Sequence, residues 1–271
     1  KMEMRKYFKL LYGFAGLLML FYSCKKDTDL SYSLYPVVAG YLYPGKEVKV
    51  RVTYQKGPTD TAAYGLPVQG LSLSVSNGLL TRVLTEDAAG YYVLRDTTFV
   101  GGSGVYSLSF EFEGKTVSAT TVMPAKPGPV SASADELVVP EPVFGSPPAD
   151  PVTVKLSWNN PDLKNHMVFF KLMEQTKVPI NGFFSGDTAG SVELNVQQAA
   201  FVDIQRMNFR YLGRYKVILA RVNPEYVELL DGSGNSSQNL TNPPTNVKNG
   251  FGIFTAIQMD TLTVPFLVRR E

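Results

Sequence analysis

The sequence predicts an all-β protein with two β-sandwich domains that follow an N-terminal signal peptide. Three observations support this prediction. Charged residues make up only 18% of the 271 residues and turn-formers are frequent, with 23 Gly and 18 Pro, which excludes a coiled coil, a wholly disordered chain and a multi-span membrane protein. Short segments alternate polar and apolar residues with a period of two. A proline-rich stretch separates two series of such segments, and a domain boundary is therefore expected there.

Residues 1–23 have the pattern of a signal peptide. Leu10–Tyr22 is an uncharged apolar run that is shorter than the roughly 20 residues of a membrane-spanning helix. Charge returns at Lys25, directly after this run. A basic n-region precedes the run and consists of Lys1, Arg5, Lys6 and Lys9.

The only Cys of the chain ends this segment. Leu20–Cys24 (Leu-Phe-Tyr-Ser-Cys) resembles a bacterial lipobox, in which Ser precedes the cleavage point and Cys is the first mature residue. The resemblance implies lipidation of Cys24 by more than one acyl chain, which anchors a protein stably where a single chain binds only reversibly. An ordinary secretory signal with an incidental Cys is the alternative. We expect a lipoprotein signal over 1–23, a tether over 24–28 and a mature protein that is tethered to the membrane without spanning it.

Residues 29–123 are predicted to form an immunoglobulin-like β-sandwich. Val48–Tyr54 alternates with period two, and Leu71–Ser76 is followed by Asn77-Gly78, a pair typical of a hairpin turn. Six or seven strands at this spacing are what a sandwich of about a hundred residues needs. The remaining strands are expected at 79–84, 91–94, 104–112 and 115–122.

Residues 124–151 contain eight prolines and are predicted to be a Pro-rich linker, or an edge strand at Glu136–Val139 between stiff extended segments.

Residues 152–271 are predicted to form a fibronectin type III-like β-sandwich. The strand that ends at Trp158 and the strand His166–Leu172 resemble the second and third strands of fibronectin type III domains, so Trp158 is expected in the core. A short helix is expected near 224–231, because Pro224 suits the first helical position. Further strands of this domain are expected at 214–223, 250–256 and 261–264.

The sequence offers no set of catalytic or metal-binding residues. One His and one Cys exclude a zinc site of several Cys and His ligands and a disulfide framework. The sequence has no Gly-x-Ser-x-Gly motif whose Ser could form a hydrolytic triad with His166. We expect His166 to be either satisfied by hydrogen bonds or solvent-facing. Asp231–Asn235 and Gly101–Gly104 lack the further residues of a calcium loop and a phosphate loop. We therefore expect no enzyme activity, no cofactor and no metal, and the dispersed Lys and Arg indicate no nucleic-acid partner.

Aromatic residues often occur in adjacent pairs, namely Tyr91-Tyr92, Phe169-Phe170 and Phe183-Phe184. Because neighbouring side chains of a strand point to opposite faces, one member of each pair should leave the core. An exposed ring could stack on a sugar or pack against a partner, although stacking inside the sandwich is the simpler interpretation.

Four segments resemble the Asp-Ser/Thr-apolar acceptor of Bacteroidota O-glycosylation, with candidate sites at Thr61, Thr97, Thr188 and Thr261.

Several segments resemble, in order, a known family. Pro36–Leu42 with Pro44-Gly45 is similar to its "vVeGyi-x-pG" segment, and Tyr106–Leu108, Gly114-Lys115 and Ala119–Thr121 are similar to its next conserved stretch. Asn246–Phe254 resembles its "N-I-x-G-G-x-G-I-F" ending, with Asn249 where a Gly is usual. The family is the Bacteroidota outer-membrane lipoproteins catalogued as domain of unknown function forty-two forty-nine. The resemblance implies an accessory lipoprotein of a TonB-dependent receptor, and it carries over no catalytic residues.

We therefore expect a lipid-anchored outer-membrane protein that associates with a TonB-dependent transporter and aids capture or delivery of its cargo. The alternative is a stand-alone cell-surface glycan- or protein-binding lipoprotein, which would need a row of exposed aromatic residues on one sheet face. The sequence leaves open whether the protein faces the cell surface or the periplasm.

The net charge of the mature chain differs from that of the whole sequence. The formal net charge of +2 becomes −1 without the signal, since 22 basic and 23 acidic residues then remain. The overall charge therefore gives no reason to expect an anionic partner.

Overall fold

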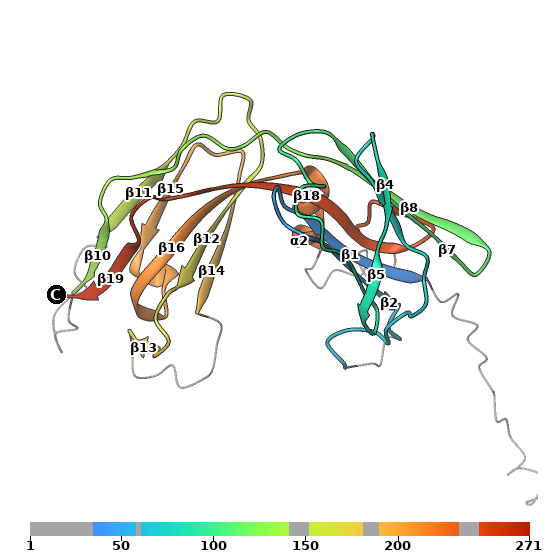
Figure 1. The fold of residues 1–271 in the computed structure, drawn as a ribbon. Coiled ribbons are helices and arrows are strands. Elements are labelled where there is room, and N and C mark those ends of the chain that lie inside the picture. Colours follow the sequence, from blue (N-terminus) through green and yellow to red (C-terminus); the bar gives the residue numbers. More distant parts are fainter. Residues whose placement is uncertain (1–34, 58–60, 141–151, 181–189, 233–243) are drawn as a thin grey trace, which may run out of the picture. The chain divides into compact units, whose positions relative to one another are not determined.

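The computed structural model describes residues 35–57, 61–140, 152–180, 190–232 and 244–271 (Figure 1). These residues form strands, one α-helix and a short 3-10 helix, η2 (Arg206–Asn208). The strands enclose two large hydrophobic cores, which confirms the predicted all-β fold of two β-sandwiches. No helix within these described ranges is long and apolar enough to span a membrane.

Two sheets enclose the first core. One contains, in spatial order, β1 (Pro36–Leu42), β2 (Val48–Tyr54), β6 (Tyr91–Leu94) and β5 (Thr85–Ala88). The other contains β17 (Val247–Lys248), β8 (Lys115–Val122), β7 (Val105–Phe112), β3 (Ser74–Ser76) and β4 (Thr81–Val83). The alternation of β2 buries Val48, Val50 and Val52 completely, and each such side chain contributes about 1.5–3 kcal/mol through burial. The predicted hairpin at Asn77-Gly78 is confirmed, because Ser76 pairs with Thr81 and Gly78 has a φ of 86°.

The second core is also enclosed by two layers of strands. One layer contains β10 (Glu136–Val139), β19 (Phe266–Arg270), β16 (Tyr211–Val222), β12 (His166–Leu172), β14 (Ser191–Gln197) and β13 (Val178–Pro179). The other contains β15 (Phe201–Gln205), β11 (Thr153–Ser157) and β9 (Ser131–Ala132). Phe170 is fully buried here, with its ring centroid 5.1 Å from that of Phe209. Trp158 is 6% exposed and packs in this core, as the sequence predicts.

Strand β18 (Phe251–Thr261, red in Figure 1) contributes to both sheets. Its first half pairs in parallel with β1, and its second half pairs antiparallel with β16. Phe254 and Ala256 therefore pack in the first core, although they lie in the 152–271 range assigned from the sequence to the second sandwich. The parallel partner of β1 has to come from a distant part of the chain, because two parallel strands cannot be joined by a tight turn.

The segment predicted as a Pro-rich linker or edge strand also supplies core residues. β9 pairs with β11, and β10 pairs with β19 at the outer edge of its sheet. β10 spans the residues of the predicted edge strand, and Leu137 and Val139 are buried in the second core. Residues 124–140 are thus extended chain that is partly integrated into the second sandwich, while 141–151 lie outside the described residues.

The helix α2 (Pro224–Gly232) confirms the helix predicted near 224–231 and begins two residues after β16 ends. It is fixed to the sheets by polar contacts at its start. Glu225 Oε1 accepts hydrogen bonds from the hydroxyls of Thr121 (2.9 Å) and Thr255 (3.0 Å). Asn223 donates to Thr121 Oγ1 and to the carbonyls of Val122 and Ala256. These contacts place α2 beside β8 and β18.

Candidate functional site

A group of tyrosines surrounds one arginine on the outer face of the β1-β2-β6 sheet, and we call it the tyrosine–arginine face. Its members are Tyr41, Arg51, Tyr64, Tyr91 and Tyr226. Since Val50 and Val52 of β2 point into the core, Arg51 between them points outward. Arg51 lies directly opposite Tyr91 of β6, and Tyr64 comes from the loop that follows β2.

Arg51 is held by aromatic contacts. Its guanidinium carbon lies 3.3 Å from the centroid of the Tyr64 ring, a stacking contact worth about 0.5–2 kcal/mol. Its Nη1 donates to the Tyr91 hydroxyl at 3.5 Å. Partial burial is the largest single effect and lowers the pKa of Arg51. The hydrogen bonds and electrostatic interactions with Tyr64 and Tyr91 together raise the pKa by more than burial lowers it, so the pKa lies above its ordinary value. The side chain is therefore a permanent, oriented cation.

A cavity of about 290 Å³ lies beside this arginine. Val37 and Ala39 of β1 line it together with Arg51, Thr53 and Tyr64, and no Asp or Glu is among its described lining residues. The cavity thus combines apolar surface, hydroxyl groups and the positive charges of Arg51 and Lys56. A small polar ligand with an anionic group would find complementary groups in it.

The aromatic group continues from Tyr41 to α2, where Tyr41 and Tyr226 are half-buried against a third hydrophobic cluster. The rings of Tyr41 and Tyr226 meet edge to face, with their centroids 6.2 Å apart. Burial, with smaller effects of Glu193, Tyr41 and Tyr43, raises the pKa of Tyr226 to about 12. Burial also raises the pKa of Tyr41, partly offset by Arg51. These phenols are therefore neutral at physiological pH and can both donate and accept hydrogen bonds.

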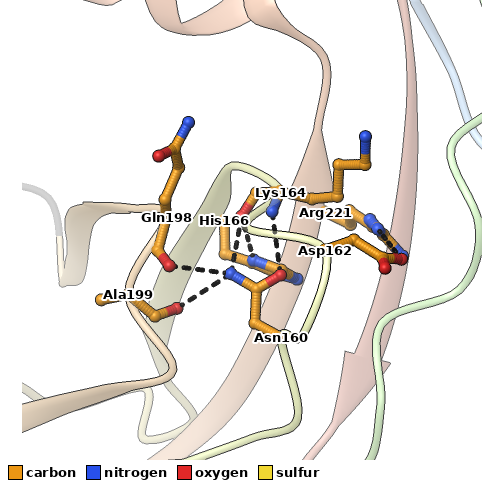
Figure 2. Close-up of polar contacts among 7 residues, drawn as sticks. All are labelled: Asn160, Asp162, Lys164, His166, Gln198, Ala199 and Arg221. Atoms are coloured by element: carbon orange, nitrogen blue, oxygen red, sulfur yellow. Dashed lines mark hydrogen bonds and ion pairs between the residues drawn. The ribbon is translucent and has the colours of Figure 1, made fainter.

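The only histidine of the chain is buried beside the second core. His166 is 1% exposed, so it does not face solvent, and only one of its ring nitrogens is satisfied. Nδ1 lies 2.8 Å from the carbonyl oxygen of Lys164, whereas Nε2 has no partner among the described residues (Figure 2). Burial lowers the pKa of His166, the Lys164 carbonyl opposes this shift, and Arg221 adds to it. The side chain is a neutral core residue next to Trp158, with ring centroids 5.9 Å apart.

Figure 2 shows that Asn160 organises the loops around this histidine. Its amide nitrogen donates to the carbonyls of Lys164 and Gln198, each at 2.9 Å, and also to that of Ala199 at 3.3 Å. Its Oδ1 accepts from the Lys164 backbone N–H. Because Asn160 is 7% exposed and fully bonded, it fastens the turn after β11 to the turn after β14. This arrangement is structural.

The site residues predicted from the sequence are described only in part by the structure. Cys24 and Thr188 lie outside the described residues, as does the Phe183-Phe184 pair. The candidate O-glycosylation sites Thr61, Thr97 and Thr261 are exposed and belong to the loop before Tyr64, the turn after β6 and the end of β18. Their modification stays a prediction, and exposure makes them accessible to it.

The sequence analysis predicted part of the tyrosine–arginine face. For the Tyr91-Tyr92 pair it placed one ring outside, and Tyr91 is 36% exposed while Tyr92 is fully buried. It missed Arg51, although the alternation of Val48–Tyr54 already directs that residue outward. It also missed Tyr64, which lies in a loop where no periodic pattern marks its position.

The fold and this face define an all-β sandwich protein with an aromatic, cationic surface site. Residues 27–263 match the model of the domain of unknown function DUF4249, and the chain belongs to this family. A comparison with curated proteins finds no match. The chain is similar to the FN1-FN3 domains of chicken CNTN1 (15% identity, TM-score 0.28), covering 70% of this chain and 59% of that one. It is also similar to the teleost fish polymeric Ig receptor ectodomain (11% identity, TM-score 0.23), covering 87% of this chain and 98% of that one.

Proposed function

We propose that this protein is a non-enzymatic, lipid-anchored protein of a Bacteroidota outer membrane that associates with a TonB-dependent transporter and aids capture or delivery of its cargo. The observation that carries this proposal is the N-terminal segment, in which a basic n-region and an apolar run end at Ser23-Cys24. Acyl chains on Cys24 would hold the protein at the membrane while its sandwiches remain in the aqueous phase.

The tyrosine–arginine face supports a role in binding and not in catalysis. Arg51 and its tyrosines provide oriented, permanently charged and aromatic contacts. The only histidine, which a hydrolytic triad would require, is buried in the second core. A protein that presents such a face from a membrane anchor is suited to concentrating a ligand near a transporter.

Metabolic labelling with a clickable fatty acid tests the anchor. We expect label on the wild-type protein and on a Lys25→Ala variant, which keeps the cysteine, and none on Cys24→Ala. Label on Cys24→Ala, or an unlabelled wild type, would contradict lipidation at Cys24.

Affinity purification from native membranes tests the partner. A receptor barrel that co-purifies in stoichiometric amount with the wild-type protein is the expected result. If the anchored protein is recovered in good yield without a barrel, the transporter association is wrong. Protease treatment of intact cells then shows which side of the membrane the protein faces, because only a surface-exposed protein is cleaved.

A second candidate function is a stand-alone cell-surface glycan- or protein-binding lipoprotein. The exposed rings of Tyr64 and Tyr91 beside Arg51 favour it, since this function requires exposed aromatic residues on one sheet face. It predicts ligand binding by the purified protein and no co-purifying barrel. The membrane purification therefore discriminates between the two functions.

A further inference from the structure

We infer that the tyrosine–arginine face binds a saccharide that carries a carboxylate, with Arg51 pairing with the carboxylate and Tyr64 and Tyr91 contacting the sugar rings. This inference rests on the proposed function only in that both describe a binding protein. It names the chemical class of the ligand and the residues that recognise it.

Arg51 has hydrogen-bonding capacity that its neighbours do not use. Stacking at 3.3 Å on Tyr64 occupies a face of the guanidinium and leaves its N–H donors at the edge of the plane. The contacts of those donors are to tyrosines, including a long one of 3.5 Å to Tyr91. No Asp or Glu in the described part of the chain forms an ion pair with Arg51. A half-buried arginine in this state matches the two oxygens of a carboxylate, which it binds with two parallel hydrogen bonds.

Two lysines are near Arg51 in the sequence, and each has a partner. Lys56, which also lines the cavity, donates its ammonium to the carbonyl of Ala62. Lys49, two residues before Arg51, has Glu47 Oε1 at 3.8 Å. Arg51 is therefore the cation whose planar group is held against an aromatic ring, and its fork of N–H donors matches the two oxygens of one carboxylate. The slightly negative charge of the chain without its signal is compatible with this, because one oriented arginine recognises one carboxylate locally.

The pairing of the strands under the face favours a sugar over an extended peptide. Peptides often bind sandwiches by adding a strand to a free sheet edge. Here β1 is paired with β18 and β2, and β2 is paired with β1 and β6, so neither strand has a free edge under the face. Recognition must use side chains. Tyr64 is 59% and Tyr91 36% exposed, and both offer a flat ring with a hydroxyl, which suits the C–H and O–H groups of a pyranose.

Calorimetric titration of the full-length, acylated protein in detergent tests the inference. The two probes are trigalacturonate and its carboxyl-reduced counterpart, which share size and linkage and differ in charge. We expect the acidic trisaccharide to bind at least about tenfold more tightly, the effect of losing roughly 1.4 kcal/mol of charge-assisted hydrogen bonding. This comparison uses the wild-type protein alone and does not depend on the folding of a variant.

Variants then assign the preference to the face. Arg51→Gln should bind both probes equally weakly, and Arg51→Lys should keep only part of the preference, because an ammonium lacks the planar fork. Tyr64→Ala should weaken binding of both probes, whereas Tyr64→Phe should preserve it. Arg82→Gln, at an exposed arginine of β4 in the other sheet, is the matched control and should behave like the wild type. Emission of Trp158 and circular dichroism verify that each variant is folded.

Three results with the two trisaccharides would overturn the inference. They are equal binding of the two probes, binding of neither, and a folded Arg51→Gln variant that keeps the preference. A tripeptide with a free carboxylate that competes as well as trigalacturonate would assign the face to peptides and would also overturn it. None of these results bears on fatty-acid labelling at Cys24 or on a co-purifying barrel, so the inference and the proposed function can fail separately.

Discussion

Gly252 lies where β18 comes closest to β1, and the backbone there has no room for a side chain. Its φ is +94°, and a Cβ atom would lie 2.0 Å from the carbonyl oxygen of Val38. Asn249 has a φ of +56°, which Asn tolerates better than most residues. Its amide also donates to the Thr116 carbonyl at 2.8 Å. Backbone geometry therefore accounts for Asn249 and Gly252 in this segment.

Replacing Gly252 by alanine should destabilise the protein severely. We expect Gly252→Ala to lose about 3 kcal/mol or more of unfolding free energy, because strain at positive φ adds to a backbone clash. Gly45→Ala is the matched control, since Gly45 has a φ of +71° with open space around its Cβ and should cost only about 1 kcal/mol. Urea unfolding measures both. Equal losses would show that the clash at Val38 is relieved at little cost.

His166 should make stability depend on pH in the weakly acidic range. Its pKa in the folded protein lies below the ordinary value of 6.5, mainly because of burial, with Arg221 adding to the shift. As the pH falls below about 6.5, the unfolded chain binds a proton first, so unfolding free energy decreases until the folded-state pKa is reached. The stabilisation is thus present above pH 6.5 and is lost on acidification.

His166→Gln tests this assignment, because it removes the titration and retains a polar side chain. Urea midpoints between about pH 5 and 8 should fall on acidification for the wild type and stay nearly constant for the variant. Asp96 and Glu136, whose pKa values are lowered from 3.8 and 4.5, lose their contribution only at lower pH and do not interfere. A variant with an undiminished slope would mean that another group is responsible.

At the scale of elements, the start of α2 fastens the helix to both sheets of the first sandwich. Asn223 bonds to Thr121 and Val122 of β8 and to Ala256 of β18, and Glu225 bonds to Thr121 and Thr255. Thr255 is fully buried and Thr121 is 3% exposed, so their hydroxyls need these partners. The same helix carries Tyr226 to the tyrosine–arginine face.

Asn223→Ala should therefore cost about 1–3 kcal/mol of stability, the penalty for leaving buried polar groups unpaired. Glu228→Ala, an exposed position of the same helix, should change stability by less than about 0.5 kcal/mol. Chemical denaturation followed by circular dichroism compares the two variants. Similar small effects would indicate that water replaces the Asn223 amide.

The sequence predicted those elements whose pattern is local. β2, β7 and β8 alternate clearly, Asn77-Gly78 marks a hairpin, and Pro224 marks a helix start. Strand β14 also alternates over Ser191–Gln197, and it was missed although its pattern is visible. The pairing of β18 with β1 could not be predicted, because no local period encodes a contact between segments more than two hundred residues apart. The stacking of Tyr64 on Arg51 depends on a loop conformation and was equally beyond prediction.

At the scale of the whole molecule, β18 is one continuous strand that pairs with β1 beside the first core and with β16 beside the second core. Phe254 and Ala256 complete the first core, and the second half of the strand pairs with β16, which supplies Val217 and Leu219 to the second. Tyr35–Glu271 accordingly forms one compact unit. Loss of the second core would leave half of β18 without its partner, and we therefore expect the cores to unfold together.

Phe170→Ala tests this coupling, because it damages only the second core. Phe170 is fully buried among Phe209, Tyr215 and Phe266, and its truncation should cost about 3–5 kcal/mol. If the cores are cooperative, hydrogen exchange should accelerate by a similar factor at Leu219 in the second core and at Val50 in the first. Phe201→Ala, at a ring that is 50% exposed, should change neither rate. Faster exchange at Leu219 with unchanged exchange at Val50 would show that each sandwich unfolds independently, and that β18 joins two separate folding units.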